Sequence, residues 1–410
     1  MSVRKRKWTT AKGVEKEAWV VDYVDGKGAR RLKTFDRKKD ADAFEATATV
    51  QIMAGTHVAD SASTTVQKAG DLWVAAAERN GLERTTTDQY RQHLELHIAP
   101  YLGATRLNEL SIAVVRAFED KLSAEGRSPA MVRKVLVSLG SLLADAQERA
   151  LVARNVVRDM RGTRKGRGRQ EKRQKGRIKV GVDIPTRDEI KAIVAALEGR
   201  WRPIILTAIF TGLRASELRG LRWSDVDFTK REIRVHQRAD RHNEIGQPKS
   251  ISGVRTVPAP PMVINTLKEW KLACPKRPTG KHDADGKPVL ALDLVFPNGS
   301  GNVEQLPNIV RRGWHPVQIA AGVTVDTGEK DENGAAILAP KYSGFHALRH
   351  FYASWCINSA DQGGLGLSAK VVQERLGHSS IVMTLDVYSH LFPRGDDGEQ
   401  MAAAEKALLG

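Results

Sequence analysis

The sequence predicts a mainly α-helical protein with small β elements, an α+β chain made of several domains. The chain has 410 residues, which at roughly 150 residues per domain fits two or three domains. Apolar residues recur at helical spacing over most of the chain after residue 64, whereas alternating apolar residues are confined to short segments. Hydrophobic residues make up 41% of the chain and charged residues 28%, a composition typical of globular proteins.

Residues 1–60 are predicted to form a small β-sheet with one helix. Apolar and polar residues alternate over residues 19–23, as in a half-buried strand, and a turn at 25–28 precedes a return strand over 30–35. Asp36 is predicted to cap the helix that follows. Three basic residues of the return strand are candidates for contacting a DNA groove: Arg30, Arg31 and Lys33. A β-rich module with a solvated basic face is the alternative interpretation.

Residues 64–157 are predicted to form a compact bundle of four helices. Four stretches carry apolar residues at helical spacing, and the last of them follows Ser128 and Pro129, a pair typical of a helix start. These apolar stripes predict a hydrophobic core, not a cofactor site. Nothing in this segment indicates a catalytic role, so a structural or binding module is expected here.

Positive charge is concentrated directly after this bundle. The chain has 65 Lys and Arg against 48 Asp and Glu, a net charge of +17. Residues 158–179 hold eleven basic and two acidic residues, a net charge of +9. This segment is predicted to be a basic interdomain linker that lies along DNA phosphates, and a solvated tether is the alternative. Its candidate DNA-binding residues are Arg164, Lys165, Arg167, Arg169, Lys172 and Arg173.

Composition and patterning exclude several classes of protein. No apolar run approaches the ~18 residues that a membrane span needs. The basic start has no apolar stretch behind it, so a secretory signal is not expected. Cys274 and Cys356 are the two cysteines, too few for a disulfide framework or a multi-cysteine zinc site. We therefore expect a cytoplasmic protein with a polyanionic partner and no membrane association.

Residues 180–395 are predicted to form a mostly helical domain with a small β segment. Strands are expected over 232–237 and 255–259. An added polar hairpin is expected over 323–341, and the tail, residues 396–410, is expected to contain a short helix.

Several residues of this domain carry chemistry. Arg214 follows a predicted helix break, and His346 and Arg349 are three residues apart, so they share a helix face. His346 and His350 have a spacing that some metal sites use, but Ala347 stands where the zincin pattern requires Glu. No third ligand is apparent, so no metal site is predicted.

Four strings occur in order between residues 200 and 392: TGLRASELRGLRWSDVDF, PKSISGVRTVP, FHALRH and LGHSSIVMTLDVYSH. Together they resemble the motifs of the tyrosine recombinase family, also called phage-type integrases. The resemblance implies that residues 1–60 bind arm-type DNA sites and that residues 64–157 form a core-binding domain. By the same resemblance the catalytic residues are Arg214, Lys249, His346, Arg349, His378 and the nucleophile Tyr388.

The resemblance implies an enzyme that cleaves and rejoins DNA through a 3′-phosphotyrosyl intermediate, without ATP, metal or another cofactor. Arg214 and Arg349 suit the phosphate oxygens because arginine stays charged and donates hydrogen bonds in a planar fork. Lys249, on a predicted hairpin, would protonate the departing 5′ oxygen. A free phenol has a pKa of ~10, so Tyr388 needs an electropositive pocket or a base to attack at neutral pH.

The expected role is the integration or excision of a mobile element. The resemblance implies a homotetramer on double-stranded DNA, with a tail that packs on a neighbouring subunit. Accessory DNA-bending or directionality proteins are possible further partners. Two alternatives stay open: a resolvase- or topoisomerase-like strand-transfer enzyme, and a non-catalytic DNA-binding regulator that keeps the fold. The complete set of six catalytic residues argues against the regulator.

Overall fold

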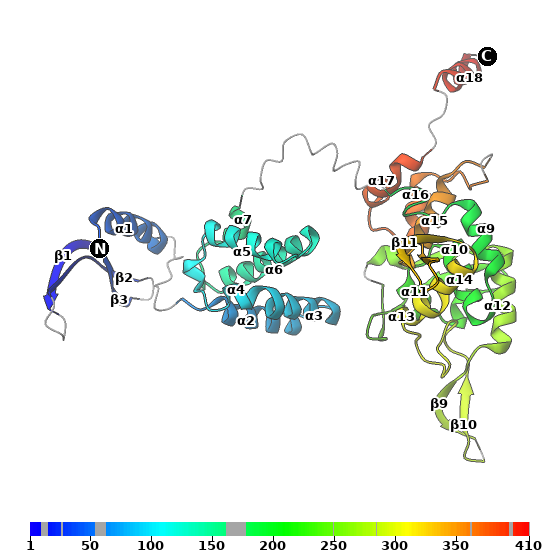
Figure 1. Ribbon diagram of the computed structural model, residues 1–410, viewed down its shortest axis with the longest axis horizontal. Helices are drawn as coiled ribbons and strands as arrows, with labels where there is room; N and C mark the ends of the chain where they lie inside the picture. The colour runs from blue at the N-terminus through cyan, green and yellow to red at the C-terminus, as the bar shows by residue number, and fades with distance from the viewer. Residues whose placement is uncertain are drawn as a thin grey trace. The chain divides into compact units, whose positions relative to one another are not determined.

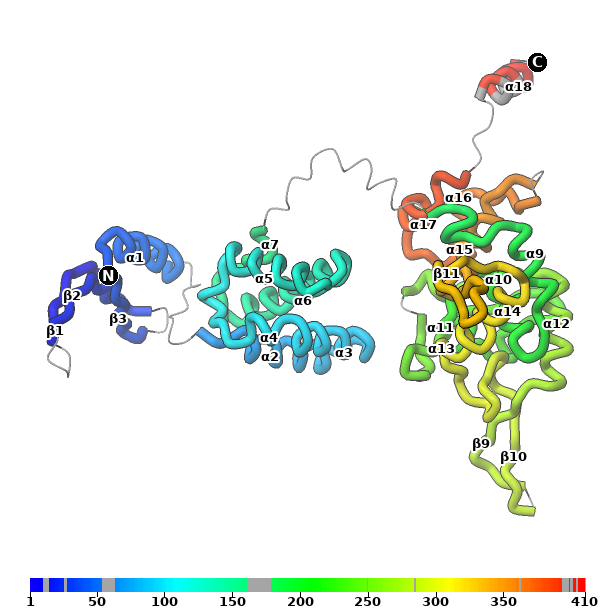
Figure 2. The backbone as a smooth tube through the Cα atoms, viewed as in Figure 1, coloured from blue at the N-terminus to red at the C-terminus, as the bar shows by residue number. Residues whose placement is uncertain are grey.

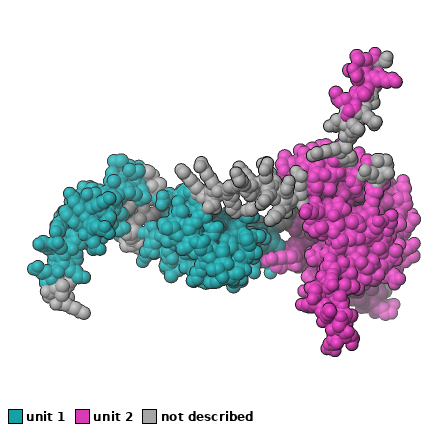
Figure 3. Space-filling view, turned by 45° about the horizontal axis from the view of Figure 1, so that its top comes forward, with its two compact units in different colours: residues 1–164 teal, residues 165–410 magenta. Residues whose placement is uncertain are grey.

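The structure, a computed structural model, describes residues 1–9, 15–25, 28–53, 63–160, 178–248, 250–283, 285–360, 363–392 and 397–409. The chain divides into two compact units, residues 1–164 and 165–410 (Figure 3). Buried apolar side chains form three clusters, among residues 3–52, 66–160 and 178–392. The predicted fold class is confirmed, because helices dominate and the strands form small antiparallel sheets (Figure 1).

The N-terminal segment is a three-stranded antiparallel sheet with one helix. Its elements are β1 (Ser2–Thr9), β2 (Glu15–Val24), β3 (Arg30–Phe35) and α1 (Lys38–Met53). The strand order is β1-β2-β3, and Phe44 of α1 packs on the cluster around Val21 and Tyr23. The two predicted strands and the helix are confirmed. Sequence patterning missed β1, because this edge strand is exposed along nearly its whole length and forms by pairing with β2.

The second segment is a helical bundle. The four predicted helices are present, and two one-turn helices accompany them: α2 (Val66–Arg79), α3 (Arg84–His93), α4 (Ala99–Leu102), α5 (Ile112–Ala124), α6 (Pro129–Glu148) and α7 (Val156–Asp159). A π-helical turn over Leu94–Ile98 joins α3 to α4. The Ser128 side chain accepts a hydrogen bond from the backbone N–H of Met131 at 3.2 Å, so the predicted cap of α6 is confirmed.

The third segment is mostly helical. Its helices are α9 (Arg187–Ala196), α10 (Arg202–Thr211), α11 (Ala215–Gly220), α12 (Pro261–Ala273), α13 (Leu306–Asn308), α14 (His315–Ala320), α15 (His346–Ile357), α16 (Ala369–Leu376), α17 (Ile381–Tyr388) and α18 (Asp397–Leu409). α10 is apolar on all sides and buried along almost its whole length, in contact with α12 and α15. It is therefore the central helix of this core.

The strands of this segment form small sheets and hairpins. They are β4 (Val226–Asp227), β5 (Glu232–Val235), β6 (Arg238–Ala239), β7 (Ile245–Gly246), β8 (Arg255–Pro258), β9 (Arg277–His282), β10 (Pro288–Ala291), β11 (Thr324–Lys330) and β12 (Ala336–Pro340). The two predicted strands are β5 and β8, which pair with each other. The predicted polar hairpin is β11–β12. The exposed β9–β10 hairpin projects away from the helices of its unit (Figure 2).

Candidate active site

Arg214 is fixed by the turn between α10 and α11. Gly212 ends α10 with a φ of 62°, a left-handed conformation that glycine adopts readily. A Cβ at this position would lie 2.3 Å from the ring of Tyr352, so close packing also requires glycine here. Arg214 is the N-cap of α11, and both its backbone N–H and its Nη1 donate to the Glu217 carboxylate at 2.8 Å.

Glu217 is a buried carboxylate held between two arginines. Both Nη atoms of Arg255 donate to it, at 3.0 and 2.9 Å, and Arg214 pairs with it from the other side. Burial by itself raises the pKa of Glu217, but hydrogen bonds from Arg255 and the charges of Arg255 and Arg214 lower this pKa to about 2. The carboxylate therefore stays ionised and fixes the orientation of the Arg214 guanidinium group.

We expect Glu217 to make stability depend on pH in the acid range. Its pKa is lower in the folded chain than the usual 4.5, so the stabilisation is fully present above pH 4.5 and is lost as the pH falls towards 2. The shift corresponds to about 3 kcal/mol. Glu217→Gln should unfold at a lower temperature at neutral pH and lose less stability between pH 5 and pH 3. Thermal unfolding of both proteins across this range measures the effect, and parallel curves would contradict it.

Arg349 lies beside Arg214 and is almost completely buried. Its Nη1 donates to the carbonyl of Gly212 at 2.7 Å, and its Nη2 donates to the carbonyl of Leu376 at 2.6 Å. Arg214 Nη2 donates to the next carbonyl, that of Gly377, at 3.0 Å. Burial and the charge of Arg214 lower the pKa of Arg349 to about 9, so this side chain is still protonated at neutral pH. Two positive groups are thus anchored on successive backbone carbonyls.

His378 follows the same turn. Gly377 ends α16 with a φ of 63°, and the Nδ1 of buried His378 lies 2.9 Å from the hydroxyl of Thr384 on α17. Burial and the charges of Arg349 and Arg214 lower the pKa of His378 to about 4. This imidazole is therefore neutral at pH 7 and can donate one hydrogen bond and accept another without adding charge.

Tyr388 is the last residue of α17 and is 2% exposed. Its hydroxyl lies 2.8 Å from Nδ1 of His350, and its ring is nearly parallel to that of His378, with 6.5 Å between the centroids. Burial raises the pKa of Tyr388 to about 12, although the charges of Arg349 and Arg214 oppose this rise. At pH 7 the hydroxyl is protonated, so nucleophilic attack requires a proton acceptor.

His346 begins α15, and its ring meets that of His350 edge-on with 4.7 Å between the centroids. The side chain reaches solvent, yet desolvation by the surrounding protein and the nearby His350 and Arg349 lower the pKa of His346 to about 4. His346, like His378, is a neutral donor or acceptor at pH 7.

The structure brings together five of the six predicted catalytic side chains, on the α10–α11 turn, α15, the α16–α17 turn and the end of α17. They are Arg214, His346, Arg349, His378 and Tyr388. Lys249, the sixth, lies outside the described residues, between β7 and β8. Among the described residues, no group of three or more His, Cys, Asp or Glu side chains is placed to hold a metal ion.

Three members of the site are not among the residues predicted from the sequence. His350 enters the sequence patterns only through its metal-site spacing, although it lies one turn beyond His346 on the same helix face. Glu217 stands three residues after Arg214, the spacing of a capping box, and this signal was available. Arg255 could not be found from local spacing, because it stands 38 residues from the carboxylate that it binds.

The predicted DNA-binding residues of the N-terminal sheet lie on β3, where each has a partner within its own module. Arg30 Nε donates to Asp22 at 2.9 Å, and Arg31 Nε donates to Asp25 at 2.8 Å. Lys33 Nζ lies 4.3 Å from the centre of the Phe44 ring. The six candidates of the basic linker lie outside the described residues: Arg164, Lys165, Arg167, Arg169, Lys172 and Arg173.

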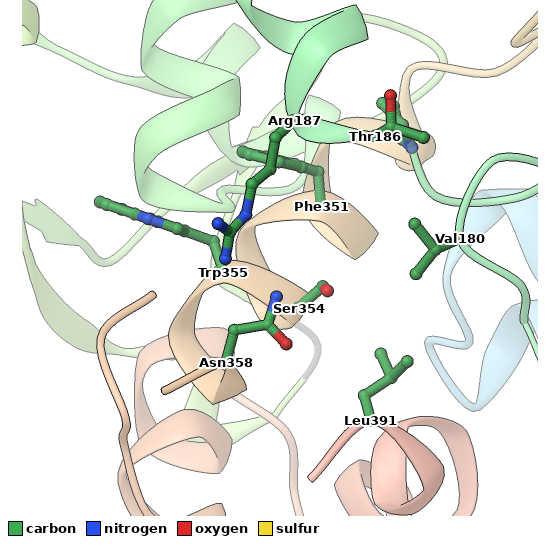
Figure 4. Close-up of a pocket in the computed structure, with 9 residues that line it drawn as sticks. Val180, Thr186, Arg187, Phe351, Ser354, Trp355, Asn358 and Leu391 are labelled. Carbon is green, nitrogen blue, oxygen red and sulfur yellow. The ribbon is translucent and has the colours of Figure 1, made fainter. Parts of the chain in front are cut away.

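A separate cavity of about 480 Å³ lies along another side of α15 (Figure 4). Phe351, Ser354 and Trp355 of α15 line it, together with Asn358 just after this helix and residues that include Arg187. None of the five convergent catalytic candidates contributes to its wall.

Among the described residues, no helix combines the length and apolar character needed to cross a membrane.

Comparison with known proteins gives a consistent result. Residues 185–394 match the model of the phage integrase family. A tyrosine recombinase XerC-like protein of Caldanaerobacter subterraneus subsp. tengcongensis is 27% identical, over 79% of this chain and 80% of the relative. The integrase of Mycobacterium phage D29 is 25% identical, over 66% of this chain and 71% of the relative.

A solved structure of the Tn1549 transposon integrase, in complex with circular intermediate DNA, matches with a TM-score of 0.57. It is 18% identical, and the match covers 84% of this chain and 100% of that chain, so the two share a fold. The family model matches half of the chain, over the region that carries all five convergent side chains. The chain therefore belongs to the phage integrase family of tyrosine recombinases.

Proposed function

We propose that this chain is a site-specific DNA recombinase that integrates or excises a mobile element. One observation carries the proposal: the hydroxyl of buried Tyr388 lies in the field of Arg214 and Arg349, which are anchored on successive carbonyls. Such an arrangement suits attack on a DNA phosphodiester, because negative charge builds on the phosphate oxygens during the reaction. Arginine forks that are fixed in advance stabilise that charge.

The proposed reaction proceeds in two steps. The Tyr388 oxygen attacks phosphorus, a 3′-phosphotyrosyl bond forms, and the bond to the 5′ oxygen breaks. Lys249 protonates that oxygen, and His346 and His378 donate hydrogen bonds to the phosphate. A 5′-hydroxyl of another strand then attacks the phosphotyrosine and releases the enzyme. The covalent bond conserves the energy of the ester, so the reaction needs neither ATP nor metal.

Covalent trapping from a random pool tests this function and identifies the target sequence in the same experiment. The full chain is incubated with random duplexes that each carry a nick, and protein–DNA adducts that survive SDS are sequenced. We expect one enriched sequence, which then serves as the suicide substrate. If the chain binds a selected duplex well but never forms an adduct, the regulator interpretation is correct.

A second assay separates recombination from simple strand passage. A supercoiled plasmid that carries two copies of the enriched site should be resolved or inverted by the chain. Relaxation of the plasmid without exchange between the two sites would favour the topoisomerase-like alternative.

We further propose that double-stranded DNA is held by four segments of the chain. Residues 1–60 would bind arm-type sites, residues 64–157 and 180–395 would clamp the core site, and the basic linker 158–179 would follow the backbone between them. The linker's net charge of +9 supports this role. Accessory DNA-bending or directionality proteins would act with the complex, in the cytoplasm.

The linker proposal predicts a change in salt dependence. Replacing its six candidate residues with Ala should flatten the plot of log affinity against log salt, by roughly 0.9 for each phosphate that the linker no longer neutralises. Fluorescence anisotropy on the enriched duplex, over a series of salt concentrations, measures the slope. A linker of shuffled order and equal charge is the control, and it should keep the original slope. An unchanged slope in the Ala variant would mean that the linker is only a tether.

We also propose a homotetramer on two DNA duplexes, in which the tail of one subunit packs on the next. The helix α18 supports this role because it presents apolar side chains to solvent. Met401, Leu408 and Leu409 are 72%, 84% and 75% exposed. Apolar side chains at such exposure on one helix are typical of a surface that a partner covers.

A further inference from the structure

His350 makes a direct contact with the reacting atom of the candidate nucleophile. Its Nδ1 lies 2.8 Å from the Tyr388 hydroxyl, and the two ring centroids are 5.8 Å apart. Among the residues that the structure describes, His350 is the hydrogen-bond partner of this hydroxyl. The contact joins α15 to the end of α17, so it does not arise from local chain geometry.

The surroundings of His350 favour a neutral imidazole at pH 7. Burial and the charge of Arg349 lower the pKa of His350, and the charge of Asp183 opposes this effect. The other titratable groups that face the ring are His346, edge-on at 4.7 Å, and Tyr388 itself. With its proton on Nε2, the neutral ring presents a lone pair at Nδ1, and the phenol hydroxyl is then the donor.

The two other histidines of the site are less suited to this task. His378 directs its Nδ1 to Thr384, and its ring lies parallel to that of Tyr388 without a hydrogen bond between them. His346 contacts His350 and reaches solvent at the start of α15. A proton leaving Tyr388 therefore meets His350 first.

We propose that His350 is a catalytic residue that accepts the phenol proton of Tyr388 during strand cleavage and returns it during religation. The inference rests on the proposed function. In cleavage the Tyr388 oxygen forms its bond to phosphorus while its proton passes to Nδ1 of His350, and the bond from phosphorus to the 5′ oxygen breaks. In religation the incoming 5′-hydroxyl oxygen attacks phosphorus and its proton returns to the general acid that supplied it in cleavage. The bond from phosphorus to Tyr388 breaks, and the imidazolium reprotonates the phenolate.

His350→Asn tests this role, because an amide near the Nδ1 position keeps a hydrogen bond to Tyr388 but takes up no proton near neutral pH. The rate of adduct formation is measured on the enriched suicide duplex in single turnover, from pH 5 to pH 9. We expect the variant to bind the duplex normally and to react roughly 10²–10⁴-fold more slowly. The wild-type rate of adduct formation should rise as the pH passes through the lowered pKa of His350 and then level off. The variant should lack this rise in rate with pH. His282→Asn on exposed β9 is the matched control.

A duplex with a bridging 5′-phosphorothiolate distinguishes two roles for His350: removing the proton of the attacking Tyr388, or protonating the leaving 5′ oxygen. A thiolate leaves without protonation, so this substrate restores the rate of variants that lack the general acid. We expect no restoration for His350→Asn. Restoration to the wild-type rate, a variant as fast as wild type with the same pH profile, or loss of DNA binding together with cleavage would each overturn the inference. If the wild-type chain itself forms no adduct, the proposed function fails instead.

Discussion

Tyr388→Phe will bind the enriched duplex as tightly as the wild type and will form no covalent adduct with it. The substitution removes the hydroxyl that would attack phosphorus, whereas the ring keeps its place at the end of α17. The fold should tolerate this change, because the loss is one hydrogen bond to His350, worth about 1 kcal/mol. SDS gels of the suicide reaction measure the adduct, and fluorescence anisotropy measures binding.

Tyr352→Phe is the matched control for this experiment. Tyr352 is also a buried tyrosine beside the site, and the polar groups near its hydroxyl are those of Cys356 and Arg375, not the catalytic candidates. Removing this hydroxyl should leave adduct formation intact. An adduct that persists in Tyr388→Phe would show that another side chain is the nucleophile, and the assignment of Tyr388 would be wrong.

Lysine in place of either anchored arginine should slow adduct formation by roughly 10²–10³-fold. Lysine keeps the charge but offers a single ammonium group, which cannot hold a backbone carbonyl and a phosphate oxygen in the geometry of the guanidinium fork. The two variants should differ in stability. Arg349→Lys replaces two separate Nη donors with one Nζ, so at least one of the buried carbonyls of Gly212 and Leu376 loses its donor, at a cost of about 1–3 kcal/mol. The Arg214 side chain is 35% exposed, so Arg214→Lys should lose less stability.

Two measurements check this pair. Single-turnover adduct formation gives the catalytic loss, and thermal unfolding gives the stability. Arg311→Lys, at an exposed position of the same unit, controls for the substitution itself. Equal stability losses in Arg214→Lys and Arg349→Lys would contradict the deeper burial of Arg349. Wild-type rates in both variants would remove the arginines from the proposed mechanism.

Sequence patterns predicted the elements whose formation depends on neighbouring residues. The cap at Ser128, the helix break before Arg214 and the hairpin over 323–341 all follow from local spacing, and each is present. The catalytic set came from resemblance, since nothing local in Tyr388 distinguishes a nucleophile from a buried core tyrosine. Its hydrogen bond to His350 spans 38 residues, and such a contact forms only when α15 and α17 pack together.

The anchoring of the two arginines on main-chain oxygens has a consequence for saturation mutagenesis. The acceptor that residue 376 presents to Arg349 is its main-chain carbonyl, so substitutions of the buried Leu376 side chain would report on core packing and not on this hydrogen bond. Gly377 differs, because any Cβ there would lie 2.9 Å from both Arg255 Nη1 and the Ser252 carbonyl, in a backbone conformation that other residues resist. Intolerance at position 377 would thus report on the backbone geometry that anchors Arg349 and Arg214, although glycine has no side chain to take part in the chemistry.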